Sequence, residues 1–158
     1  MSVYRKILVP IDGSATSNRG LIEAIELAKD QRATLRLVHV LDELILGPGV
    51  EAVVYLDNTV DILRDAGKQL VADAEAMVRE QGLNAESVIL EIMGGRAADS
   101  IVAEANTWGA DLIVLGTHGR RGARRLVMGS DAEEIVRTAR IPVLLVRSEA
   151  PVRASRNP

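Results

Sequence analysis

The sequence predicts a single α/β domain in which helices cover both faces of a five-stranded parallel sheet. Short apolar runs alternate along the whole chain with segments whose apolar residues recur at the helical period. The run over residues 6–11 is almost continuously apolar, as is typical of a central strand buried on both faces. Strand–helix alternation implies a parallel sheet with right-handed crossovers. The 158 residues are enough for one compact domain with a sizeable core.

Five strands and four helices are expected. The strands are placed at residues 6–11, 33–41, 87–93, 112–115 and 142–146. Glu91 lies inside the third apolar run, which suggests a partly wet strand at a sheet edge. The helices are placed around residues 21–28, 60–77, 98–105 and 132–139, where apolar residues recur at helical spacing. Residues 42–57 are expected to form a loop, and a domain over 1–147 to precede a flexible tail over 148–158.

Composition excludes several classes of protein. The formal net charge of −3 argues against a general nucleic-acid binder. The absence of cysteine removes disulfides and thiolate metal sites, and two histidines far apart make a structural zinc site a poor expectation. No apolar run approaches the roughly 20 residues that span a bilayer. We therefore expect a cytoplasmic protein with no membrane or nucleic-acid partner.

The most informative segment is residues 116–130, in which the glycines have a regular spacing. It reads Gly-x2-Gly-x9-Gly-Ser, follows an apolar run and precedes a helical segment. Glycine lets backbone amides approach an anion, and a helix start adds unpaired N–H groups and a positive dipole end. The segment also contains four arginines, whose forked donors suit phosphate oxygens: Arg120, Arg121, Arg124 and Arg125. These features predict a phosphate-binding loop.

Three further positions point to the same place. Asp12 lies just past the first strand, Val40 near the end of the second and Gly116 just past the fourth. Ligands of open α/β sheets bind outside the carboxyl ends of the strands, where the strand order reverses. If the first and fourth strands are neighbours, these three positions meet in one crevice.

In these features the chain resembles the nucleotide-binding members of the universal stress protein family. Gly116, Gly119, Gly129 and Ser130 match the family's glycine signature, and the aspartate in VPIDGS and the valine in LVHVLDE match its other hallmarks. The resemblance implies a Rossmann-like fold of the adenine nucleotide alpha hydrolase type, with strand order 3-2-1-4-5. It also implies a stress-response homodimer, often joined through the last strand, here Pro142, Val143, Leu144, Leu145 and Val146.

The resemblance further implies a site for ATP or another adenine nucleotide. Asp12 would accept a hydrogen bond from a ribose hydroxyl, Val40 would pack against the adenine edge, and Ser130 would donate to phosphate. Magnesium could arrive with the nucleotide, since it needs few protein ligands. The implied site consists of residues from both ends of the glycine-rich segment and from the first two strands: Pro10, Asp12, Val40, Gly116, Thr117, Gly119, Arg120, Gly129 and Ser130.

Each of these features also has a purely structural explanation. Residues 130–133 read as a capping box, in which Ser130 would be the N-cap and its oxygen would engage the Glu133 amide. Asp12 could serve only a turn or a helix cap. Asp131 would compete with a bound phosphate for the dipole field of the same helix. The second hypothesis is therefore a protein-interaction module of the same family that binds no nucleotide.

Enzymatic activity is not expected beyond slow ATP hydrolysis. His39, inside the second strand, is expected to be structural, and neither His39 nor His118 has neighbours that form a catalytic triad. No P-loop sequence is present, and no obvious base is placed to orient an attacking water. A third hypothesis is an enzyme of a related fold, such as an adenylating ligase or an electron-transfer flavoprotein, but the chain lacks a substrate domain.

Overall fold

The computed structural model describes residues 2–43, 57–117 and 128–147, which include every expected strand and helix. Each strand begins and ends within two residues of its predicted bounds. Gly119 and Arg120 of the predicted site, and the predicted tail, lie outside the described residues. In chain order the elements are β1 (Lys6–Pro10), α1 (Ala15–Gln31), β2 (Thr34–Asp42), α2 (Asp57–Glu80), β3 (Ala85–Ile92), α3 (Ala97–Trp108), β4 (Leu112–Gly116), α4 (Ser130–Thr138) and β5 (Val143–Val146).

All five strands pair in parallel in the order β3-β2-β1-β4-β5, which confirms the predicted sheet. The central strand β1 pairs with both β2 and β4, and Ile7 is in register with Leu35 and Leu112. The order of the strands along the sheet therefore reverses between β1 and β4. β3 lies at an edge, as the charge at Glu91 predicted.

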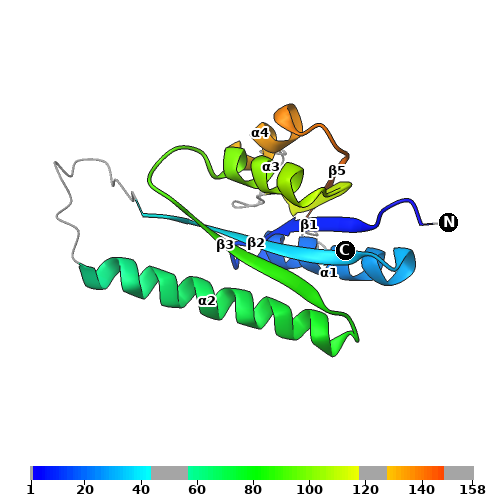
Figure 1. The fold of residues 1–158 in the computed structure, drawn as a ribbon, viewed down its shortest axis with the longest axis horizontal. Coiled ribbons are helices and arrows are strands. Elements are labelled where there is room, and N and C mark those ends of the chain that lie inside the picture. Colours follow the sequence, from blue (N-terminus) through cyan, green and yellow to red (C-terminus); the bar gives the residue numbers. More distant parts are fainter. Residues whose placement is uncertain (1, 44–56, 118–127, 148–158) are drawn as a thin grey trace, which may run out of the picture.

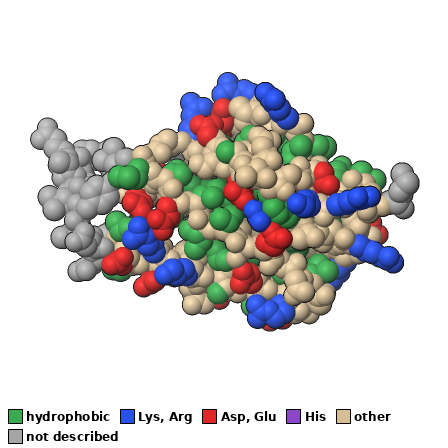
Figure 2. All heavy atoms as spheres, in the orientation of Figure 1, with side chains coloured by type: hydrophobic (Ala, Val, Ile, Leu, Met, Phe, Trp, Pro, Cys, Tyr) green, Lys and Arg blue, Asp and Glu red, His purple; other side chains and the backbone are tan. Residues whose placement is uncertain are grey.

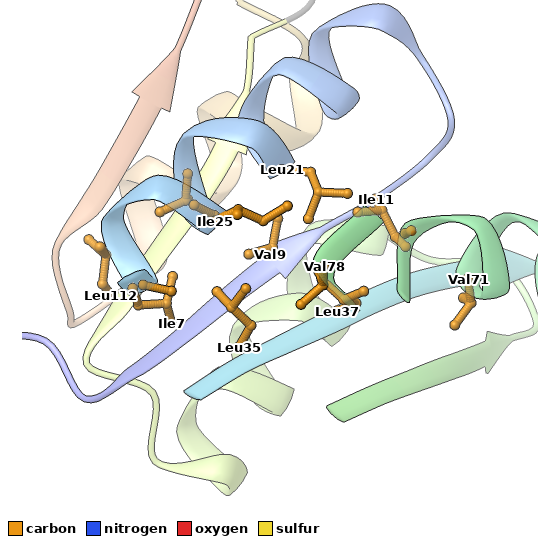
Figure 3. Packing of buried hydrophobic residues seen from close by; sticks show 14 residues of the cluster. Ile7, Val9, Ile11, Leu21, Ile25, Leu35, Leu37, Val71, Val78 and Leu112 are labelled. Carbon is orange, nitrogen blue, oxygen red and sulfur yellow. The ribbon is translucent and has the colours of Figure 1, made fainter. Parts of the chain in front are cut away.

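Two layers of helices cover the sheet. α1 and α2 lie against one face, and α3 and α4 against the other (Figure 1). Alternate residues of β1 serve the two layers, because successive strand residues point to opposite faces. Ile7 and Val9 pack with α1 and α2 (Figure 3), whereas Leu8 packs with α3 and α4. The centre of the sheet is thus buried on both faces. The edge formed by the carboxyl ends of the strands is where a ligand site is expected.

α1 packs closely on β4 through two glycines. A methyl group on Gly116 would overlap the Thr16 carbonyl group and would lie 2.9 Å from the Ser17 nitrogen. From the other side, a methyl group on Gly20 would lie 2.9 Å from the Gly116 nitrogen. Real side chains are almost never this close to backbone atoms, so both positions require glycine for the approach of the helix to the strand.

The only tryptophan of the chain joins the amino ends of the strands to the end of α3. The ring of buried Trp108 has the Lys6 Nζ at 5.0 Å and the Arg36 guanidinium at 4.8 Å from its centroid. Lys6 also donates to the Trp108 carbonyl at 2.9 Å, and Arg36 donates to Glu104 at 2.5 Å. Cation–π contacts and ion pairs therefore fasten this end of the molecule.

The outer edge of the sheet at β3 is charged. Arg36 of β2 pairs with Glu86 at 2.5 Å, and Arg64 of α2 pairs with Glu91 at 2.9 Å. The hydrogen bond from each arginine holds the pKa of its glutamate below the usual value. Figure 2 shows charged side chains of both signs grouped on this face of the molecule. The edge thus presents ion pairs to solvent.

Candidate functional site

A pocket of about 200 Å³ lies at the carboxyl ends of β1, β2 and β4, where the strand order reverses. The first turns of α1, α3 and α4 surround it, because each of these helices begins on this side of the sheet. The described residues that line the pocket come from these strand ends and helix starts: Pro10, Ile11, Asp12, Ser14, Thr16, Ser17, Val38, His39, Val40, Ala97, Ile101, Leu115, Gly116, Asp131, Ala132 and Ile135.

Four of the predicted site residues meet in this pocket. Pro10, Asp12, Val40 and Gly116 all line it, although they come from three different strand ends. Thr117, Gly129 and Ser130 are described but are not among the lining residues. The crevice expected from the positions of Asp12, Val40 and Gly116 is therefore present.

Asp12 holds a turn and is also among the residues that line the pocket. Its Oδ1 accepts a hydrogen bond from the Ser14 N–H at 2.9 Å, across Gly13 with a φ of +77°. Its own N–H donates to the Ser17 Oγ at 3.0 Å, and the Ser14 Oγ caps α1 by accepting from the Ser17 N–H. The carboxylate thus holds the turn and at the same time lines the pocket.

The expected capping box at residues 130–133 was wrong. Gly129 is the N-cap of α4, and Ser130 is already the first helical residue. A capping serine must keep extended backbone angles so that its oxygen can turn back to the next amides, and here Gly129 has those angles. No described side chain caps α4, nor α3 after Arg96. The amides of both first turns therefore lie at the pocket without a side-chain cap.

The two residues at the end of β4 have structural partners. Thr117 donates to the Val146 carbonyl oxygen from its N–H at 2.8 Å and from its Oγ1 at 3.3 Å. Gly116 has to be glycine because a side chain there would overlap the carbonyl group of Thr16. Its conformation is therefore explained by helix packing and does not by itself indicate a ligand. The start of the glycine-rich segment is thus fixed by β5 and α1.

Sequence reasoning missed the wall of the pocket that α3 and α4 provide. Ala97 and Ile101 line it from α3, and Ala132 and Ile135 from α4. Ile101, Ala132 and Ile135 are buried in the hydrophobic cluster beneath these helices. Their helical spacing in the sequence therefore predicted core residues and gave no sign of a pocket. Their place in the first two turns of helices that follow strands was the available signal.

His39 is held by the backbone, as expected of a structural histidine. Its Nδ1 lies 2.9 Å from the Ile11 carbonyl oxygen, and a methyl group on Gly67 of α2 would lie 3.1 Å from its ring. Within residues 2–43, 57–117 and 128–147, no group of three metal-ligating side chains is assembled. No described helix is long and apolar enough to cross a membrane.

A parallel sheet whose order reverses at a pocket defines a Rossmann-like α/β protein. Residues 3–147 match the model of the universal stress protein family, and the chain belongs to this family. A universal stress protein of Methanocaldococcus jannaschii is 33% identical over 148 residues, which are 92% of this chain and 84% of the relative.

Two solved structures place the fold in the same family. A universal stress protein family member from Burkholderia pseudomallei is 34% identical with a TM-score of 0.73, over 94% of this chain and 99% of that one. The universal stress protein from Archaeoglobus fulgidus in complex with dAMP is 25% identical with a TM-score of 0.63, over 91% of this chain and 98% of that one.

Proposed function

We propose that this protein is an adenine-nucleotide-binding regulator of the stress response, with ATP, accompanied by magnesium, as its ligand. The observation that supports the proposal is the pocket at the switch point of the sheet, where Pro10, Asp12, Val40 and Gly116 lie together. The complex of the Archaeoglobus fulgidus relative with dAMP supports an adenine ligand in this family.

The chemistry of the pocket suits the parts of a nucleotide. Val40, Ile101 and Leu115 offer apolar surface to a purine ring. The Asp12 carboxylate is an acceptor for ribose hydroxyls. The first turns of α3 and α4 offer amides and the positive ends of two helix dipoles to phosphate. Catalysis beyond slow ATP hydrolysis is not part of the proposal, and occupancy of the pocket is the regulatory signal.

The test is to identify and measure the ligand directly. We expect mass spectrometry of the small molecules released by heating fresh protein to detect an adenine nucleotide. Calorimetric titration with Mg-ATP should give a dissociation constant in the micromolar range or below. The proposal would be contradicted if no nucleotide is released and no adenine nucleotide gives binding heat. A ligand-independent interaction module would then be the better account.

The protein is proposed to form a homodimer through β5, and a charge at Leu144 is expected to break it. β5 is an edge strand that pairs only with β4 in the described structure, and the Leu144 side chain is 37% exposed. Leu145, in contrast, packs against the buried cluster under α3 and α4, so a charge there would also harm folding. Leu144→Glu should give a monomer by light scattering.

The matched control for the dimer is Ile62→Glu. Ile62 is 66% exposed on α2, which lies over the other half of the sheet. This variant should keep the mass of the wild type. A dimer that survives Leu144→Glu in a folded protein would remove β5 from the interface.

A further inference from the structure

The peptide unit that joins Ile11 to Asp12 lies at the pocket with both of its polar groups engaged by side chains. Its carbonyl oxygen lies 2.9 Å from the His39 Nδ1, and its N–H donates to the Ser17 Oγ at 3.0 Å. His39 belongs to β2 and Ser17 to α1, so two different elements hold the same peptide plane. Because the plane is rigid, its orientation sets the position of Asp12 in the pocket.

The contact with Ile11 also defines where the His39 ring carries its proton. A carbonyl oxygen only accepts hydrogen bonds, so the Nδ1 is the protonated nitrogen and the Nε2 of the neutral ring is bare. His39 is half-buried and lines the pocket together with Ile11 and Asp12. The ring therefore acts on this turn as a donor at one fixed atom.

α2 contacts the ring of His39 at the edge opposite the Nδ1. A methyl group on the buried Gly67 would lie 3.1 Å from the Cδ2 of His39 and 3.3 Å from its Nε2, which is closer than most real contacts of this kind. The Nδ1 already lies at a normal hydrogen-bond distance from the Ile11 oxygen, so the ring has little room to move toward it. The ring is thus wedged between α2 and the turn.

We propose that His39 is a positioning residue for the nucleotide, and that α2 influences the affinity of the pocket through this ring. The inference rests on the proposed nucleotide-binding function and concerns how the same pocket is held in shape. His39 acts through the peptide unit between Ile11 and Asp12, so it needs no contact of its own with the ligand.

The first experiment compares His39→Leu with His39→Asn. The two side chains have nearly the same branched shape, but only asparagine carries an N–H donor close to the place of the Nδ1. Calorimetry with AMP and with Mg-ATP should show a loss of about tenfold for His39→Leu, the effect of one lost hydrogen bond. His39→Asn should recover most of that loss. Equal affinities in the two folded variants would assign His39 to packing alone and overturn the inference.

The second experiment perturbs the ring from α2. Gly67 is not among the described residues that line the pocket, and alanine favours a helix more than glycine does. Gly67→Ala should nevertheless weaken nucleotide binding by a few-fold, because the methyl group displaces the ring. Added to His39→Asn, whose shorter side chain leaves room for the methyl group, the same change should cost no further affinity. An equal loss in both backgrounds would show that the methyl group does not act through His39.

Ala66→Gly is the matched control for the helix. Ala66 is the exposed neighbour of Gly67 and is likewise absent from the described lining of the pocket. This variant lowers the helix propensity of α2 and should bind nucleotide like the wild type. A loss of affinity similar to that of Gly67→Ala would assign the effect to the stability of α2 and contradict the role of the ring.

Two further results separate this inference from the function on which it rests. Imidazole nitrogen NMR in mildly alkaline buffer should find the proton of His39 on the Nδ1 without any ligand, and a proton on the Nε2 instead would overturn the inference. Wild-type affinity in folded His39→Leu would overturn it too and leave nucleotide binding intact. If no adenine nucleotide binds the folded wild-type protein, the proposed function itself fails.

Discussion

Replacing Gly116 with alanine is expected to destabilise the protein by about 3 kcal/mol or more, because the new methyl group overlaps backbone atoms. The atoms that it would meet belong to the Thr16 carbonyl group and the Ser17 nitrogen, which a side-chain rotation cannot move away. α1 would have to shift off β4, with loss of contacts in the cluster that contains Leu21 and Val114. Urea unfolding followed by the emission of Trp108 measures the effect.

Gly82→Ala separates this overlap from the conformational cost of replacing a glycine. Gly82 has a φ of +76° and no atom within 4 Å of the position of a methyl group, so alanine there suffers backbone strain alone. We expect a loss of about 1 kcal/mol for that variant. A Gly116→Ala protein as stable as Gly82→Ala would show that α1 does not need the close approach to β4.

A tryptophan in place of Ala97 is expected to abolish nucleotide binding in a folded protein. Ala97 is the half-buried first residue of α3 and lines the pocket, so the indole would occupy space that the ligand needs. The affinity should fall by about 100-fold or more, which corresponds to about 2.7 kcal/mol of lost ligand contact. Calorimetric titration with Mg-ATP gives the affinity, and circular dichroism melting reports the fold.

The control carries the same substitution at Ala103, an exposed residue of the same helix that does not line the pocket. Ala103→Trp should bind nucleotide like the wild type. Unchanged affinity in a folded Ala97→Trp protein would place the nucleotide elsewhere.

The sheet could be predicted because its signal is local. The apolar run of β1 and the alternation of periods along the chain depend only on neighbouring residues, and the strand order followed from the family resemblance. Asp12, Val40 and Gly116 were expected in one crevice because they sit at strand ends and the first and fourth strands are neighbours, whereas Pro10 was expected there from the family resemblance.

Two features could not be predicted from the sequence. One depends on a contact between distant segments, and the other on two N-cap residues of similar preference. The packing role of Gly116 needs the position of Thr16, which the spacing of a glycine motif does not contain. Gly129 and Ser130 are both acceptable N-caps, so the sequence could not decide which one begins α4. That one-residue difference places Asp131 at the second position of the helix, where it lines the pocket.

The two edges of the sheet are chemically unlike, and this difference limits how the protein can assemble. β5 presents Val143–Val146, an entirely apolar strand, whereas the β3 edge bears the pairs of Arg36 with Glu86 and Arg64 with Glu91. In the proposed dimer, pairing of β5 with β5 of a second copy would be isologous and would use the apolar edge of each copy. Growth of the proposed dimer into a filament would require β3 to accept a strand across its ion pairs, so the charged edge would favour an assembly that closes at two copies.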